Sequence, residues 1–295
     1  MSFTPLASDF YGFESQLTDP EREALAALRV WLETDVKPLV NDHWDRAEFP
    51  HEILPAFHRH PVFGMQWDET KSFENSAVYR GWVALELARV DASIATYVGV
   101  QNGLALGAVA VCGSPEQRAE WLPKLASGEV IGAFGLTEPL SGSDSAQGLR
   151  TTATREGDEW ILNGAKRWIG NATFSDITVI WAKDTADGQV KGFIVPTSTP
   201  GYTATKIERK QALRIVQNAD IVLEDVACPR RCACRMRTRS ATRRPCCVSR
   251  APRSHGRPSE SRSAPMRVRS RTRRSASSSA SPSHPTSSCS STSPR

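Results

Sequence analysis

The chain has 295 residues, of which 39% are hydrophobic, and it carries a formal net charge of +5. The part of the chain that can fold, about 228 residues, is long enough for one or two domains with real hydrophobic cores. The charge is uneven: residues 229–295 hold 17 Arg and one acid while residues 1–228 hold 20 basic and 31 acidic residues, which excludes a basic globular body.

Residues 1–130 show helical patterns. Thr18-Asp-Pro-Glu21 is a capping box with an early proline, which predicts a helix start. The apolar residues that follow recur on one helical face: Leu25, Leu28, Leu32, Val36 and Leu39. We expect further helices over about 76–90, over 93–111, where the apolar composition indicates burial, and from Ser114 to about residue 126.

The pattern changes to strands from residue 131. Gly157-Asp158 lies between two strand-like runs, which predicts a β-hairpin. Further strands are expected over about 177–181, 192–196 and 221–223. Helices followed by strands, without alternation, indicate an α+β multidomain chain, and short strands between turns favour a small β-barrel or sandwich. We therefore predict a helical domain over 1–130 and a β-barrel domain over 131–228.

Residues 229–295 form an Arg/Ser-rich tail without Leu, Ile, Phe, Trp or Tyr. Such a segment cannot bury enough apolar surface to fold, so we expect disorder. One interpretation is a non-catalytic binding protein whose basic tail engages nucleic acid or acidic surfaces through their charge. Since no aromatic residues are interleaved for base stacking, specific nucleic-acid recognition is not expected.

Two strings in the middle of the chain carry the chemical information. Residues 134–144, FGLTEPLSGSD, end an apolar run with a hydroxyl, a carboxylate and small turn residues. Such a turn can leave backbone N–H groups bare, as a nest for an anion such as a pyrophosphate. Residues 166–171, KRWIGN, place a flat indole beside a glycine, which suits one wall of a flat cofactor.

Together the two strings resemble the flavin-binding signature of acyl-CoA dehydrogenases. The resemblance extends from about residue 6 to 225 and includes ARVDAS at 88–93 and GFIVP at 192–196. The branch that it resembles most is that of glutaryl-CoA dehydrogenases and short-chain acyl-CoA oxidases. The family implies FAD-dependent α,β-dehydrogenation of an acyl-CoA thioester, short-chain or glutaryl-like, to a 2-enoyl-CoA. The electron acceptor would be an electron-transferring flavoprotein or oxygen.

The resemblance also assigns site residues. The cofactor would be bound by Phe134, Leu136, Thr137, Ser143, Trp168, Ile169 and Gly170. The acyl-CoA substrate would meet Ser143, Ala95 and Thr96. Gly170 replaces the Thr or Ser of most dehydrogenases, which leaves the electron acceptor open. Ala95 falls where glutaryl-CoA dehydrogenases have an arginine, and alanine cannot clamp a carboxylate, so we expect a short, uncharged acyl chain.

The tail has a second interpretation, a frame shift near residue 228. Shifted by one base, the codons permitted by residues 276–290 are compatible with a segment of the family's third domain, a helical bundle. Those permitted by residues 228–240 are compatible with the stretch that precedes it. That bundle supplies the family's catalytic glutamate and its homotetramer contacts. On this interpretation the chain is truncated and inactive, it has no catalytic residue, and its homotetramer is doubtful.

The remaining expectations concern compartment and metals. Five of the seven cysteines lie in the tail, and the two others, Cys112 and Cys228, are typical of a reducing, cytoplasmic protein. The first ten residues lack a basic, apolar signal peptide. No uninterrupted apolar run reaches ~18 residues, so no membrane span is expected. His43, His51, His58 and His60 lack the spacing of a metal site.

Overall fold

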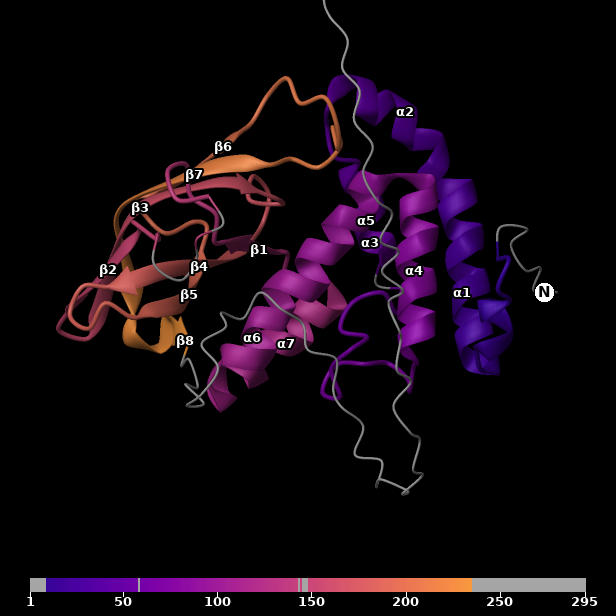
Figure 1. The fold of residues 1–295 in the computed structure, drawn as a ribbon, viewed down its shortest axis with the longest axis horizontal. Helices are drawn as coiled ribbons and strands as arrows, with labels where there is room; N and C mark the ends of the chain where they lie inside the picture. The colour runs from indigo at the N-terminus through magenta and orange to yellow at the C-terminus, as the bar shows by residue number, and fades with distance from the viewer. Residues whose placement is uncertain (1–8, 58, 143, 145–147, 235–295) are drawn as a thin grey trace, which may run out of the picture. The chain divides into compact units, whose positions relative to one another are not determined.

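The computed structural model describes residues 9–57, 59–142, 144 and 148–234. All of these described residues belong to one compact unit. The predictions for Ser143 and for the tail beyond Cys234 lie outside the described residues. Within the described part, helices come first along the chain and strands follow, as the sequence predicts (Figure 1).

The N-terminal part is helical. Its elements in chain order are η1 (Phe13–Gln16), α1 (Asp19–Trp31), the π-helical η2 (Leu32–Val36), α2 (Lys37–Arg46), η3 (His51–Ile53), α3 (Leu54–Phe57), α4 (Ala77–Val90), α5 (Ala92–Gly99), the π-helical η4 (Val100–Leu106), α6 (Gly107–Cys112) and α7 (Pro115–Ser127). The predicted capping box is confirmed, because the Thr18 N–H donates to Glu21 Oε2 over 2.8 Å. A second capping box, of Ser114 with Gln117, begins α7.

Residues 92–112 form one continuous helix through α5, η4 and α6. It is 21 residues long and apolar enough to cross a membrane by length and composition. However, 67% of its most apolar window is buried inside the structure, and core helices of soluble proteins pass the same test. Its apolar character is therefore explained by packing, as the sequence predicts.

The second part is a mixed β-sheet. Its strands are β1 (Gly132–Gly135), β2 (Thr152–Glu156), β3 (Glu159–Ile169), β4 (Ile177–Asp184), β5 (Val190–Pro196), β6 (Tyr202–Lys206), β7 (Ala219–Pro229) and β8 (Ala233–Cys234), with the short helix η5 (Arg230–Cys232) before β8. The predicted hairpin is confirmed: β2 and β3 pair in antiparallel around Gly157, whose φ of 59° suits a tight turn. The central strand β4 is almost wholly buried, and it lies parallel to β1 and β2.

The prediction of a β-barrel is wrong, because the sheet is open. The strand order is β6-β7-β3-β2-β4-β5-β8, with β1 added beside β4. Among the described strands, β6 pairs with β7 alone and β8 with β5 alone, and no ladder joins them (Figure 1). A barrel requires such closure, and β8, with two residues, is too short to supply a closing ladder.

The sheet continues past the predicted domain end at residue 228. Pro229 pairs with Glu159, and the Arg230 N–H donates to the Asp158 carbonyl over 2.9 Å. Cys234 is 3% exposed and pairs with Gly192. The expected disorder is therefore wrong for residues 229–234, because Pro229, Ala233 and Cys234 pair with strands of the sheet and the short helix η5 joins them.

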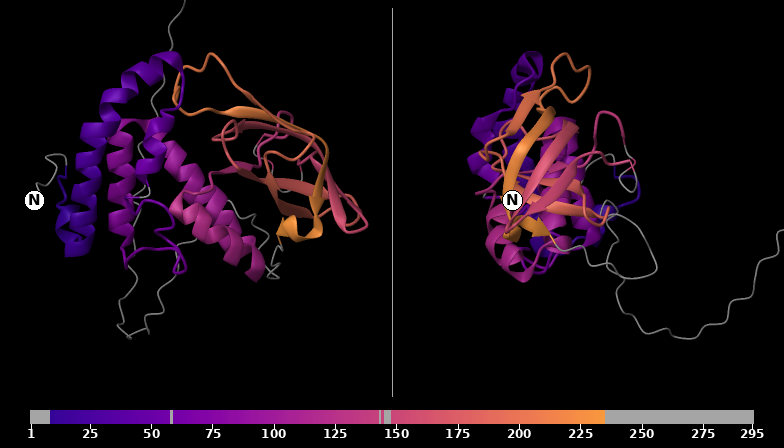
Figure 2. Two further views of the ribbon diagram at one scale, coloured as in Figure 1. Left: turned by 180° about the vertical axis from the view of Figure 1, so that it is seen from behind. Right: turned by 90° about the vertical axis from the view of Figure 1, so that its left-hand side faces the viewer.

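A buried glutamine joins the helices to the sheet. Gln101, in η4, is fully buried, and its amide nitrogen donates to the carbonyls of Leu125 and Val130 over 2.9 and 2.8 Å. Its carbonyl oxygen accepts from the Gly132 N–H at the start of β1 over 2.7 Å. Gly132 is required here, because a Cβ would lie 2.5 Å from Ala105 Cβ. The helix containing η4 thus contacts β1 directly (Figure 2).

Candidate cofactor site

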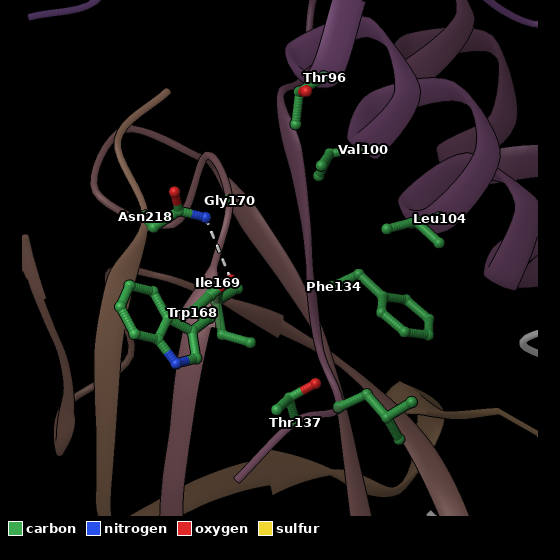
Figure 3. A pocket seen from close by; sticks show the side chains of 10 residues that line it. Thr96, Val100, Leu104, Phe134, Thr137, Trp168, Ile169, Gly170 and Asn218 are labelled. Carbon is green, nitrogen blue, oxygen red and sulfur yellow. Dashed lines mark hydrogen bonds between the residues drawn. The ribbon is translucent and has the colours of Figure 1, made fainter. Parts of the chain in front are cut away.

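A cavity of about 280 Å³ lies at this junction of helix and sheet. Figure 3 shows its lining, which comes from the helix 92–112, from β1 and the turn after it, from the end of β3, and from the residue before β7. The lining residues are Thr96, Val100, Leu104, Phe134, Leu136, Thr137, Trp168, Ile169, Gly170 and Asn218. All ten are uncharged.

The helical wall is apolar except for one hydroxyl. Val100 and Leu104 begin and continue the π-helical segment η4. The Thr96 hydroxyl, one turn earlier, donates to the Ala92 carbonyl over 2.8 Å. A threonine hydroxyl keeps lone pairs free while it donates, so Thr96 can still accept a hydrogen bond from a guest.

The opposite wall contains Trp168 in an unusual backbone conformation. Its φ is 64°, the left-handed region, which a bulky residue rarely adopts. The residue lies in an irregular stretch of the β3–β7 ladder, between Lys166 and Ile169. Its indole is 52% exposed, and the Arg167 guanidinium lies 5.5 Å from the ring centroid. A large aromatic face is thus presented beside the cavity instead of being packed in the core.

The turn after β1 is held by a buried ion pair. Thr137 lines the cavity, and its carbonyl accepts from the Arg167 N–H over 2.8 Å. The next residue, Glu138, is 4% exposed, and its carboxylate meets the fully buried Lys166 ammonium over 2.8 Å. The same carboxylate accepts from the backbone N–H groups of Arg150 and Thr151 over 2.7 and 2.9 Å.

The environment of this pair changes both pKa values. Burial alone would raise the pKa of Glu138, but the hydrogen bonds from Lys166, Thr151 and Arg150 outweigh burial and lower the pKa to about 2. Burial lowers the pKa of Lys166 to about 8, although Glu138 opposes that shift. Both groups therefore remain charged at neutral pH.

Lys166 also closes a gap in the sheet. Along one side of β4, the pairing with β1 ends at Ile180 and the pairing with β2 begins at Lys183. The Trp181 carbonyl falls in this gap and accepts from the Lys166 ammonium over 2.6 Å. The ammonium also donates to the Leu136 carbonyl over 3.3 Å. One side chain thus connects β3, β4 and the turn that carries Thr137.

The structure brings together most of the residues that the sequence assigns to the cofactor. Six of the seven line the cavity: Phe134, Leu136, Thr137, Trp168, Ile169 and Gly170. The seventh, Ser143, lies outside the described residues. The neighbouring Gly142 N–H donates to the Glu138 carbonyl over 3.2 Å, so this group is used within the turn. The anion nest stays a prediction.

The two helix residues assigned to the substrate differ in position. Thr96 lines the cavity, whereas Ala95 is partly buried against the core of the helical part. The sequence does not predict that Val100, Leu104 and Asn218 line the cavity. It also does not predict that Glu138 and Lys166 hold the turn that carries Thr137. Helical spacing from Thr96 to Val100 and Leu104, four residues each, is the one local signal that could have found two of them.

The family comparisons match both parts of the chain. Residues 18–129 match the model "Acyl-CoA dehydrogenase, N-terminal domain", and residues 133–226 match "Acyl-CoA dehydrogenase, middle domain". A crystal structure of a glutaryl-CoA dehydrogenase from Mycobacterium smegmatis in complex with FADH2 is 37% identical, with a TM-score of 0.70. That similarity covers 76% of this chain and 57% of the other.

Curated relatives are similar over shorter stretches. The mitochondrial short-chain specific acyl-CoA dehydrogenase of Mus musculus is 40% identical over 148 residues, which is 49% of this chain and 36% of the mouse protein. An acyl-CoA dehydrogenase of Bacillus subtilis is 33% identical over 206 residues, 68% of this chain and 54% of the bacterial protein. The chain thus spans between about a third and about half of these two relatives.

Proposed function

The chain belongs to the acyl-CoA dehydrogenase family, and we propose that its cavity holds the ring system of FAD in an enzyme that dehydrogenates an acyl-CoA thioester. The observation that carries the proposal is the convergence of Thr137, Trp168 and the apolar helical wall on one cavity. Bound there, FAD would supply the two-electron acceptor that removes a hydride from the acyl chain.

The residues present fit such a group. The cavity of about 280 Å³ is at the small end of ligand pockets, so it suits one part of a dinucleotide, not the whole. Trp168 offers an exposed aromatic face, and Phe134 and Leu136 offer apolar contact. Polar groups at Thr137 and Thr96 suit the heteroatoms at the edge of a flat ring.

The helical wall and the turn after β1 have distinct physical roles on this proposal. The apolar residues of η4 and β1 exclude water, which strengthens every hydrogen bond made inside. The turn that carries Thr137 is fixed by the Glu138–Lys166 pair, so its backbone and hydroxyl meet the ring edge in one orientation. None of the ten described lining residues carries a carboxylate, so the base that takes the α proton is not among them.

The first test is FAD binding by the full chain, followed through flavin fluorescence. We expect saturable binding, and we expect Trp168→Ala to weaken it about tenfold because one aromatic face is lost. Trp121→Ala is the matched control, since that indole lies on α7 under Lys124 and does not line the cavity. Equal affinity in both variants, or no saturable binding by the unmodified chain, would contradict the proposal.

The acyl group that this site accepts is proposed to be short and uncharged. Thr96, which lines the cavity, and Ala95 beside it are the two helix residues that the resemblance assigns to the substrate, and both are uncharged, so neither would give the far carboxylate of a glutaryl group an ionic partner for the water it loses. We expect butyryl-CoA to bind the full chain at least about tenfold more tightly than glutaryl-CoA in calorimetric titrations. Thr96→Arg should reduce or reverse this preference for butyryl-CoA. If the unmodified chain binds glutaryl-CoA more tightly than butyryl-CoA, the proposed preference for an uncharged acyl group is wrong.

The electron acceptor stays open between an electron-transferring flavoprotein and oxygen. Gly170 has no side chain to offer a hydroxyl, and the space is limited, because a Cβ there would lie 3.2 Å from Val100 Cγ2. Measuring reoxidation of the reduced, FAD-loaded chain by each acceptor would separate the two.

A further inference from the structure

The loop between β6 and β7, residues 207–218, is organised around one lysine. The Lys210 ammonium donates to the Leu213 carbonyl and to Asn218 Oδ1, each over 2.7 Å, and also to the Val216 carbonyl. A protonated lysine has three donors and no acceptor, so these three bonds use its full capacity. The loop is therefore wrapped around a single cation.

The same loop is anchored on the helical part. Arg214 donates to the carbonyls of Trp44 and Asp45 over 2.9 and 2.8 Å, and its guanidinium lies 4.8 Å from the Trp44 ring centroid. Ile215 is fully buried in the core of the helices. The loop thus has a fixed position before it reaches the cavity at Asn218.

Asn218 connects this loop to Trp168, on the wall of the cavity opposite the helix. Its Nδ2 donates to the Trp168 carbonyl over 3.2 Å, as the dashed line in Figure 3 shows. Because Oδ1 accepts from Lys210, the orientation of the amide is set by its partners, and Nδ2 must face the cavity side. The Cβ position of Gly170 lies 3.9 Å from Nδ2, an ordinary van der Waals distance, so Gly170 lies directly beside this contact.

We propose that Asn218 and Lys210 are positioning residues for the cofactor site, which hold Trp168 in its left-handed conformation through the Trp168 carbonyl. A bulky residue at a φ of 64° needs outside contacts to keep it there, and this hydrogen bond is one of them. The inference rests on the proposed function for its effect on FAD, but the restraint on Trp168 belongs to the chain alone.

The test compares three variants of the full chain. Asn218→Asp keeps an acceptor for Lys210 but replaces the donor to the Trp168 carbonyl by a repelling oxygen. Lys210→Met removes the bond that orients the amide. Gln217→Glu is the matched control, because the side chain of Gln217 accepts from the Thr173 hydroxyl over 2.8 Å and does not line the cavity.

Two readouts are needed, one without ligand and one with FAD. By hydrogen exchange without ligand, we expect the amides of residues 167–171 to exchange about tenfold faster in Asn218→Asp and in Lys210→Met, and we expect the melting temperature to be unchanged in Asn218→Asp, which keeps the bond to Lys210. With FAD, we expect about tenfold weaker binding in both variants. The double variant should be no worse than the more affected single one, because both act through one chain of bonds.

The outcomes separate the two proposals. If the unmodified chain does not bind FAD, the proposed function fails, while the exchange of residues 167–171 still decides the positioning role. Unchanged exchange in Asn218→Asp would overturn positioning, even if FAD affinity falls, because the amide would then act on the cofactor directly. An equal effect of Gln217→Glu would overturn it as well.

Discussion

Replacing Lys166 by methionine is expected to lower the free energy of unfolding by about 3–5 kcal/mol. The variant leaves the Glu138 carboxylate buried without its cation, and it leaves the Trp181 carbonyl in the gap of the sheet without a donor. Both losses expose the full desolvation cost of a buried group. Chemical denaturation at neutral pH measures the effect.

The control for this variant is Lys37→Met. Lys37 pairs with Glu33 over 2.7 Å on the surface of the helices, where its side chain is 58% exposed. Such pairs contribute about 0.5 kcal/mol or less. If the two methionine variants cost the same, the buried pair does not hold the turn that carries Thr137.

The same pair predicts a pH dependence. The pKa of Glu138 is about 2 in the folded chain and 4.5 in the reference state, so the unfolded chain takes up a proton first as the pH falls. The ionised Glu138 carboxylate contributes its full share to the free energy of unfolding above about pH 4.5. This contribution, roughly 3 kcal/mol, is lost as the pH falls from about 4.5 to about 2. Lys166→Met should shrink this loss, because removing the cation raises the pKa of Glu138 in the folded chain toward its value in the unfolded chain.

Replacing Gln101 by methionine is expected to cost at least about 3 kcal/mol. Methionine fills a similar volume but leaves the Gly132 N–H and the Val130 carbonyl without the partner that the structure gives them. Gln101 lies beside Val100 on the helix, and Gly132 begins β1, the strand of Phe134. We therefore expect the helical side of the cavity and β1 to move apart as well. FAD affinity should therefore fall together with stability.

Gln217→Met serves as the control for Gln101, because Gln217 is only half-buried in the loop before β7 and its side chain accepts a hydrogen bond from the Thr173 hydroxyl. Denaturation and flavin fluorescence of the two variants are compared under one condition. A loss of stability with unchanged FAD affinity would show that Gln101 supports the core but does not set the distance between the walls.

The features that the sequence predicts correctly are local. The Thr18–Glu21 capping box, the helix start at Ser114 and the Gly157-Asp158 hairpin depend on residues within four positions of one another, so their patterns are visible without the fold. Strand β6 is not predicted, because Tyr202–Lys206 alternates half-buried and exposed residues and lies at the edge of the sheet. Its assignment depends on β7, which lies further along the chain.

The errors concern pairing over long distances. Whether the sheet closes into a barrel depends on whether its two end strands, β6 and β8, pair with each other, and no short sequence pattern shows whether they do. Lys166 reads as an ordinary strand lysine in the sequence, and its partners are 15 to 30 residues away. The aromatic and glycine signals of the site could be predicted, but the buried polar groups that hold them could not.

The pairing of β3 with β7 has a consequence for synthesis of the chain. Ile169, which follows Trp168 at the end of β3, pairs with Ala219, which is translated 50 residues later. At ribosomal speeds of 5–20 residues per second this is an interval of roughly 3–10 seconds. During that time the β2–β3 hairpin can form, while the other edge of β3 has no strand beside it and can pair with a strand of another nascent chain. Vectorial synthesis thus completes the cavity last, and aggregation competes with folding mainly before residue 229 has emerged.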